Sequence, residues 1–466
     1  MDDYREPPET AKGIAKSLGP GLILAASIVG SGELIATTRT GAEAGFTLLW
    51  LILIGCVIKV FTQVEICRHC ITHGETTVSA LQRVPKAGPF IAWFWFITFL
   101  TGLGQLGGIV GGVGQAMAIF LPVAGEHSAT FWAGVVTLVT VFMLLRGGFT
   151  FIEIFCTALV ASFTFLTVGN FFALQTQPDW AMQMADWKEG FSFGLPEAPG
   201  ALLTALAAFG IIGIGAAELV AYPYWCLEKG YGRWIGRRSD GRRSDVQNSD
   251  QENEDQKGWI RRARGWIRVL QWDAWASMVI YTLSTVAFYL LGAAVLHRLG
   301  MVPAGSEMIK TLAEIYGPVF GSAGKVILLV GAFAVLFSTF FVSNATKARL
   351  MTDALHVFRL RPSPDEAARK RSVRWFSVAF PILCFVIYAL FPKPVVLILL
   401  SGLMQALLLP LLGVAALYFR FRTIDPDLRP GKLWDAMLIL SVVAFLVVGA
   451  TIGWTKGSEF FEFILR

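Results

Sequence analysis

Two short stretches, Gly30-Ser31-Gly32-Glu33-Leu34-Ile35-Ala36 and Gly215-Ala216-Ala217-Glu218-Leu219-Val220-Ala221, repeat one pattern within two separate apolar regions of the chain. Each stretch places one carboxylate inside an expected membrane span. An ionisable group at bilayer depth is costly, so two such groups at equivalent places indicate a site that handles charge. The glycines before each glutamate weaken the helix where freed backbone groups could line a cavity.

The composition is that of an integral membrane protein. Of 466 residues, 55% are hydrophobic and only 15% are charged, and the mean hydropathy is +0.60. These values exclude an ordinary soluble globular protein. The net charge of +6 comes from basic residues clustered between apolar spans, where they set topology. We therefore expect membrane lipid around the protein and no nucleic-acid partner, while the oligomeric state is left open.

Apolar segments of about 20 residues predict eleven transmembrane helices. They lie near 19–42, 46–71, 88–121, 128–146, 150–175, 199–227, 270–297, 322–351, 372–391, 394–420 and 434–455. The connecting segments rich in Lys and Arg, at 228–269, 352–374 and 420–432, all fall on one side. The positive-inside rule then predicts a cytoplasmic N-terminus and an external C-terminus, and we expect the bacterial inner membrane.

The repeated stretches fall in the first and sixth spans, which makes the two halves of the chain inverted repeats. We expect an all-α membrane protein with a 5+5 inverted repeat and discontinuous helices 1 and 6, an arrangement typical of secondary transporters. The predicted parts are a cytoplasmic N-terminus at 1–18, a first five-helix repeat at 19–198, a second at 199–420 containing a cytoplasmic loop at 228–269, and an additional helix 11 with the C-terminus at 421–466. No catalytic constellation is recognisable, so we do not expect an enzyme.

Framework residues throughout the chain resemble the Nramp divalent-metal transporter family. They are Gly19-Pro20, Thr40 to Trp50, Gln63, Thr72-His73-Gly74, Gly210 to Gly213, Asp273, and Ser401 to Pro410. The resemblance implies a LeuT-like fold and a family that moves divalent transition metals by alternating access, usually with protons.

The binding motifs differ from those of the family. Where the family has Asp-Pro-Gly-Asn, this chain has Gly30 to Glu33, and where the family has Met-Pro-His-Asn it has Ala217 to Val220. Ile214 replaces an Ala whose carbonyl binds metal, a contact that would survive the change. The tenth-helix Gln appears as Gly402, with Gln405 nearby, and residues 101–108 of the third span contain no carboxylate. Proton coupling by the usual route of the family is therefore not expected.

The substituted site predicts oxygen ligands for a cation. Glu33 and Glu218 are the expected metal ligands, together with freed carbonyls and the hydroxyls of Ser31 and Thr37. Such donors favour hard divalent ions such as Mg²⁺, Ca²⁺ or Mn²⁺ over softer metals. The small residues Gly30, Gly32 and Ala217 would leave room for bound water. The cation would be the substrate, and we expect no cofactor.

Lys59, in the middle of the second span, supports an alternative. A buried ammonium would most simply pair with Glu33 or Glu218. Lys59 would then replace a coupling cation and leave a pocket for a non-metal solute, although a lysine that snorkels or faces a water-filled vestibule fits as well. A binding or sensor protein without transport is a third interpretation. Lys347 and Arg349 are interpreted as interfacial anchors.

Overall fold

The computed structural model describes residues 4–123, 125–146, 149–198, 200–236, 249–360 and 365–454, and these form helices without a β-strand. The first half contains α1 (Ala11–Ser17), α2 (Pro20–Ile28), η1 (Ser31–Thr37), α3 (Thr38–Ala44), α4 (Leu49–His73), α5 (Thr77–Gln82), α6 (Gly88–Phe120), η2 (Gly125–His127), α7 (Ser128–Arg146), α8 (Phe149–Leu174) and α9 (Met184–Gly190).

The second half begins with the pair α10 (Ala201–Ile211) and α11 (Ala216–Lys229). It continues with α12 (Tyr231–Ile235), α13 (Ser249–Leu291), η3 (Gly292–His297), η4 (Gly305–Glu307), α14 (Met308–Ala313), η5 (Glu314–Tyr316), α15 (Gly317–Phe320), α16 (Ser322–Val357), α17 (Glu366–Leu390), α18 (Pro394–Tyr418), η6 (Phe419–Thr423), η7 (Pro426–Leu428) and α19 (Lys432–Trp454).

Among the described residues, nine helices are long and apolar enough to span a membrane. A tenth candidate is the pair Pro20–Ile28 and Gly32–Ala44, which is bent by 41°. The predicted fifth span corresponds to α8. Its segment Ala161–Leu174 is an apolar helix, but this segment is shorter than the nine candidate spans. The helices fall where hydropathy placed them, but the predicted total of eleven spans is not established.

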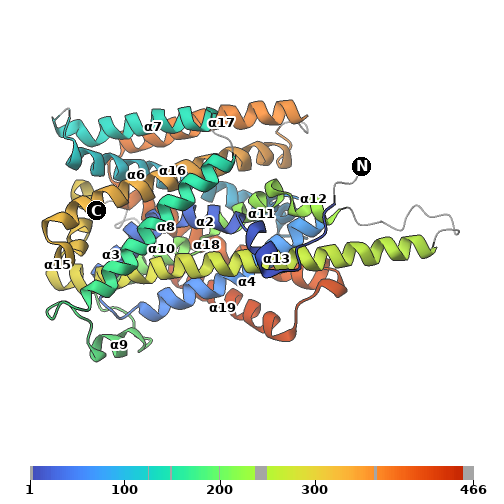
Figure 1. The fold of residues 1–466 in the computed structure, drawn as a ribbon, viewed down its shortest axis with the longest axis horizontal. Coiled ribbons are helices and arrows are strands. Elements are labelled where there is room, and N and C mark those ends of the chain that lie inside the picture. Colours follow the sequence, from blue (N-terminus) through green and yellow to red (C-terminus); the bar gives the residue numbers. More distant parts are fainter. Residues whose placement is uncertain are drawn as a thin grey trace.

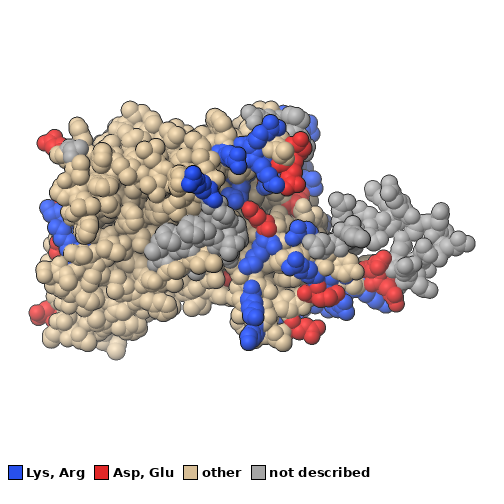
Figure 2. Space-filling model, turned by 45° about the horizontal axis from the view of Figure 1, so that its top comes forward, with Lys and Arg blue, Asp and Glu red and all other residues tan. Residues whose placement is uncertain are grey.

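The bundle has a buried centre and an apolar outer surface. In Figure 1, α7 and α17 form one edge of the molecule and α19 lies at the opposite edge, with α10 and α18 between them. Large apolar side chains on the peripheral helices are exposed, among them Leu138, Phe165, Leu390 and Val447. Because lipid is the solvent for such surfaces, their exposure is favourable in a bilayer. Figure 2 shows Lys and Arg gathered toward one end of the molecule, beside a broad surface of uncharged residues.

Glycines allow α10 and α18 to approach closely at the centre. A Cβ atom added at Gly402 would clash with the backbone carbonyl of Ala207, and one added at Gly210 would clash with the carbonyl of Gly402. Small residues at helix contacts let membrane helices gain van der Waals energy that the lipid does not supply. This contact holds the end of α10 against α18.

The structure corrects the predicted loop at 228–269. The loop is interrupted by α12, and its second part is helical because α13 begins at Ser249 and runs without a break into the seventh span. Trp259, Ala263, Trp266 and Leu270 form a buried stripe at helical spacing along this extension. Trp266 packs on Trp234 of α12 at a centroid distance of 4.6 Å. Residues 259–267 therefore belong to α13 and not to a loop.

We predict that Gly402→Ala destabilises the protein. The new methyl group meets a backbone atom that cannot rotate away, and overpacking of this kind costs about 1–3 kcal/mol. Gly169→Ala is the matched control, because nothing lies within 4 Å of its added Cβ and alanine favours a helix. Thermal unfolding in detergent should show a lower melting temperature for the first variant only. Equal melting temperatures would show that α10 and α18 are not tightly packed here.

Candidate functional site at the breaks of two helices

The first break separates α2 from α3. After Val29 the backbone leaves the helix at Gly30, with φ −150° and ψ −106°, and continues as the π-helix η1. The wide turns of π-helices occur frequently at functional sites. Gly30 lies against Thr339 of α16, and Gly32 lies against the backbone carbonyl of Ile211. The break in the first span therefore touches the end of α10 directly.

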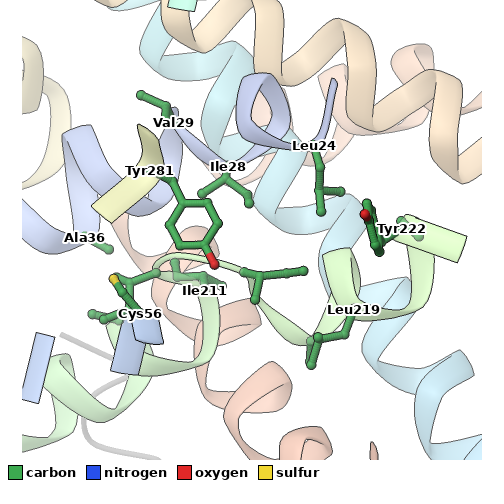
Figure 3. Packing of buried hydrophobic residues seen from close by; sticks show 14 of the residues in the cluster. Leu24, Ile28, Val29, Ala36, Cys56, Ile211, Leu219, Tyr222 and Tyr281 are labelled. Carbon is green, nitrogen blue, oxygen red and sulfur yellow. The ribbon is translucent and has the colours of Figure 1, made fainter. Parts of the chain in front are cut away.

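The second break separates α10 from α11. Ile212 is extended, and Gly213 has φ +55°, a conformation that favours glycine. A Cβ at Gly213 would lie 3.0 Å from the ring of Tyr281 and 3.2 Å from the sulfur of Cys56. Figure 3 shows Tyr281 and Cys56 beside Ile211 and the unwound connection that follows it. The unwound segment is thus enclosed on both sides by neighbouring helices.

Glu33 joins the two breaks. Its side chain, carried by η1, is fully buried. Oε1 accepts hydrogen bonds from the backbone N–H of Gly213 at 3.2 Å and from the hydroxyl of Thr285 of α13 at 3.1 Å. Oε2 has no hydrogen-bond partner in the described part of the chain. A buried carboxylate with an unsatisfied oxygen requires a proton or a cation, because leaving it charged and alone is costly.

Tyr281 adds a second unsatisfied polar atom near Glu33. Its phenolic oxygen is buried and has no hydrogen-bond partner among the described residues. Tyr281 interacts electrostatically with Glu33 and lies one helical turn before Thr285 on α13. The carboxylate oxygen and the phenol together offer an acceptor and a donor to a bound molecule or water.

Glu218 lies in the first turn of α11 and is partly buried. A Cβ added at Gly215 would be 2.6 Å from Oε2 of Glu218 and 3.0 Å from Oε1 of Gln405. Gln405 of α18 accepts a hydrogen bond from the N–H of Ala217 at 3.0 Å and donates one to Gln105 of α6 at 2.9 Å. Glu218 and Glu33 are close enough to interact electrostatically.

Lys59 is not paired with either glutamate. Its ammonium donates to the backbone carbonyl of Phe209 and, at 2.9 Å, to that of Ile212, and it lies 4.5 Å from the centre of the Phe209 ring. No ion pair joins Lys59 to a carboxylate in the described residues. Since the C-terminal end of a helix carries partial negative charge, Lys59 stabilises the end of α10 as a cation would. The predicted pairing with Glu33 or Glu218 is therefore wrong.

Lys347 is also buried, which corrects its interpretation as an interfacial anchor. Its side chain is 8% exposed, its ammonium donates to the carbonyl of Phe99 at 3.4 Å, and it interacts electrostatically with Glu218. Arg349, two residues later, instead forms an ion pair with Glu228 at 2.8 Å. The region around the breaks thus contains two buried lysines and two glutamates.

The remaining predicted residues lie at the same junction. The hydroxyl of Thr37 donates to the carbonyl of Gly32 at 2.8 Å, so it braces the break. Ile214 is buried within the second break. The side chain of Ser31 lies outside the described residues. In the described part of the chain no three His, Cys, Asp or Glu side chains form a metal-binding group. A cation would therefore need carbonyl, hydroxyl or water oxygens besides the two carboxylates.

Sequence reasoning missed three side chains at this site, Gln105, Tyr281 and Thr285, and noted Gln405 only as lying near Gly402 in the sequence. The hydroxyls on α13 lie in an apolar span without any distinguishing pattern. Gln405 had a detectable signal, because an amide in an apolar span needs a partner. The structure shows that this partner is the N-terminus of α11, so Gln405 holds the second break from the side of α18.

Asp273 anchors the N-terminal start of the first broken helix. Its carboxylate accepts hydrogen bonds from the N–H groups of Gly19, at 2.9 Å, and Gly21, at 2.6 Å, at the start of α2. It also accepts one from the hydroxyl of Tyr222 of α11 at 2.8 Å. A carboxylate at a helix N-terminus satisfies free donors and the helix dipole. Asp273 therefore links α2, α11 and α13.

Comparisons with known proteins show which family and which solved structures this chain is similar to. The family model described as Nramp, natural resistance-associated macrophage protein-like, matches residues 21–225 and 242–455. A search of curated protein sequences finds no significant match. The chain is similar to the crystal structure of a mutant of the Eremococcus coleocola manganese transporter, with 16% identity, a TM-score of 0.66, and coverage of 100% of this chain and 95% of the other.

Two further structures are similar at lower scores. MhsT in complex with L-phenylalanine has 15% identity and a TM-score of 0.55, with coverage of 96% of this chain and 100% of the other. A nucleobase-cation-symport-1 family transporter with bromovinylhydantoin bound has 14% identity and a TM-score of 0.54, with coverage of 98% and 95%. These likenesses confirm the predicted all-α LeuT-like fold with inverted repeats and discontinuous first and sixth helices.

We predict that Asp273→Ala lowers the thermal stability more than Tyr222→Phe. The first variant leaves two buried N–H groups at the start of α2 without an acceptor, which costs about 1–3 kcal/mol each. The second removes one hydrogen bond and leaves the helix cap in place, at a cost of about 1 kcal/mol. Thermal unfolding of both purified variants measures the difference. Equal losses would mean that the cap on α2 does not depend on Asp273.

Proposed function

The chain belongs to the Nramp family, and from this premise we propose that it is a secondary transporter that moves a divalent metal cation by alternating access. Members of this family are transporters and not enzymes. We further propose that its selectivity has shifted toward hard ions such as Mg²⁺ or Mn²⁺, with the cation as substrate.

One observation carries this proposal: the unpartnered Oε2 atom of Glu33 at the junction of the two breaks. Lys59 donates to backbone carbonyls, so it leaves this oxygen open. Glu218 interacts with the same charge from the first turn of α11. Two carboxylates neutralise a divalent ion, which matters in a low-dielectric interior.

The donor types support the proposed selectivity. Besides the thiol of Cys56, carboxylate, hydroxyl, amide and carbonyl oxygens surround the junction, and oxygen ligands suit Mg²⁺, Ca²⁺ and Mn²⁺. No sulfur or imidazole ligand stands at the positions of the family's Met-Pro-His-Asn motif, where this chain has Ala217 to Val220. The solved manganese transporter supports a metal substrate for a chain of this fold.

Alternating access follows from the proposed organisation of the chain. We propose that the repeats at 19–198 and 199–420 rearrange around the fixed junction, with 1–18 and 421–466 as flanking parts. The protein is integral to the membrane. The basic end seen in Figure 2 supports a cytoplasmic N-terminus and an external C-terminus, in what we propose to be a bacterial inner membrane.

We predict that Glu33→Gln abolishes saturable uptake of Mn²⁺ and Mg²⁺ into proteoliposomes. The amide is isosteric and can still accept from Gly213 and Thr285, so the fold should remain intact while the charge is lost. Glu218→Gln should also reduce the saturable uptake of Mn²⁺ and Mg²⁺. Elution as a single species and an unchanged melting temperature check the fold.

Glu314→Gln is the matched control for this experiment, because Glu314 is exposed and lies on η5. It should transport like the wild type. Wild-type metal uptake by a Glu33→Gln, Glu218→Gln double variant would end the proposal.

A second candidate, transport of a non-metal solute, is favoured by the two buried lysines. Lys59 and Lys347 offset the charges of Glu33 and Glu218, so the region is nominally neutral before any ion binds. Lys59 already occupies the carbonyl end of α10, where it would replace a coupling cation. A neutral or zwitterionic solute would then need no accompanying inorganic ion.

Under this second candidate, wild-type proteoliposomes should accumulate zwitterionic amino acids without Na⁺ or K⁺. Lys59→Ala should lose amino-acid uptake in the absence of Na⁺, because the carbonyls of Phe209 and Ile212 would then lack a cation. Any uptake that remains should require added Na⁺. Lys325→Ala, on the exposed part of α16, is the control. Metal uptake with no amino-acid uptake by the wild type would remove this candidate.

A further inference from the structure

We propose that an anionic phospholipid binds at the basic end of the molecule, in a pocket between α7 and α17. The pocket has a volume of 490 Å³ and is lined by Leu145, Arg371, Arg374, Trp375, Val378 and Ala379. It lies on the outer surface of the bundle, away from the helix breaks, and lipid binding there is independent of what the protein transports.

The two arginines of the pocket have no partner in the described chain. On the same turns of α17, Lys370 pairs with Glu366 at 2.7 Å and Arg369 pairs with Asp353 at 3.4 Å. Arg371 and Arg374, by contrast, have neither an ion pair nor a hydrogen bond to any described residue. Their positive charge is therefore available to an external anion.

A third guanidinium lies at the adjacent end of α7. Arg146 is the last residue of that helix and follows Leu145, which lines the pocket. Its only described contact is with the ring of Phe142, at 4.5 Å from the ring centre. The helices α7 and α17 pack against each other, and Figure 1 shows them together at one edge of the bundle. Basic groups from both helices thus border one site.

The pocket lies at the boundary between polar and apolar surface. No charged residue follows Arg374 until Lys393, so α17 enters its apolar part immediately after the two arginines. Trp375 is 65% exposed and packs edge-on against Phe376 at 5.1 Å. Exposed tryptophan at this depth is typical of the membrane interface, where lipid phosphates lie. Figure 2 shows the basic residues gathered at this end of the molecule.

A phospholipid matches both parts of the pocket. Guanidinium groups bind phosphate oxygens in pairs of hydrogen bonds, and Leu145, Val378 and Ala379 offer an apolar wall to an acyl chain. No carboxylate lines the pocket, which disfavours a metal cation. Basic pockets between transmembrane helices bind lipid headgroups in this way.

A second basic pocket in the described part of the chain does not share these properties. It lies beside α13 and is lined by Lys257 and three arginines, but also by Glu9 and Asp427. One of its arginines, Arg261, is paired with Glu6 at 2.8 Å. Its positive charge is partly neutralised within the protein, so it serves as a control site.

Native mass spectrometry of the full chain in detergent tests the proposal, with dioleoylphosphatidylglycerol, dioleoylphosphatidylcholine and inorganic phosphate as probes. We expect the wild type to bind the anionic lipid at least about tenfold more tightly than the zwitterionic one. The Arg371→Gln, Arg374→Gln double variant should lose roughly tenfold to thirtyfold in affinity for the anionic lipid. Arg371→Lys, Arg374→Lys should retain part of it.

The control is the Arg261→Gln, Arg264→Gln double variant, which removes the same charge at the other pocket and should bind the anionic lipid like the wild type. Melting temperatures in phosphatidylcholine establish that the variants fold. Equal binding of the two lipids by the wild type would overturn the proposal, as would a loss of binding only in the control variant. Displacement of the anionic lipid by inorganic phosphate would show that the pocket binds a soluble anion instead.

Discussion

The hydrogen bond from the backbone N–H of Gly213 to the carboxylate of Glu33 is the contact on which the rest of the structure depends. It joins the unwound parts of two helices that are far apart in the sequence. Each break frees backbone groups that cannot remain unsatisfied in the middle of a membrane. The breaks must therefore be enclosed by other helices, here α13 and α16. The result is a buried, polar junction at the centre of an apolar bundle.

Side chains hold the ends of both broken helices: hydrogen-bond acceptors lie at the N-termini, and a cationic donor lies at a C-terminus. Asp273 accepts from the N-terminus of α2, and Lys59 donates to the carbonyl end of α10. Gln405 accepts from the N-terminus of α11 and thereby ties it to α18. These three contacts fix the half-helices while leaving one oxygen of Glu33 open. The half-helices are thus tied to their neighbours, while Oε2 of Glu33 stays without a partner among the described residues.

Hydropathy predicted most spans, because an apolar stretch of membrane length has few alternatives. The repeated Gly-x-x-Glu stretches located both breaks, since glycine and a buried acid are each unusual there. The partner of Lys59 could not be predicted, because it is the backbone of another helix and no residue type reveals it. The start of α13 at Ser249 was not predicted, because the polar residues between Ser249 and Trp259 show no apolar helical spacing.

The central claim is that the open oxygen of Glu33 binds a divalent cation. Anomalous X-ray scattering from crystals grown with Mn²⁺ tests it most directly. The account predicts a peak at the junction of the two breaks, within about 2.6 Å of a Glu33 carboxylate oxygen, the range for hard cations bound by oxygen. Absence of a peak there, with density for an organic solute beside Glu33 instead, would contradict it.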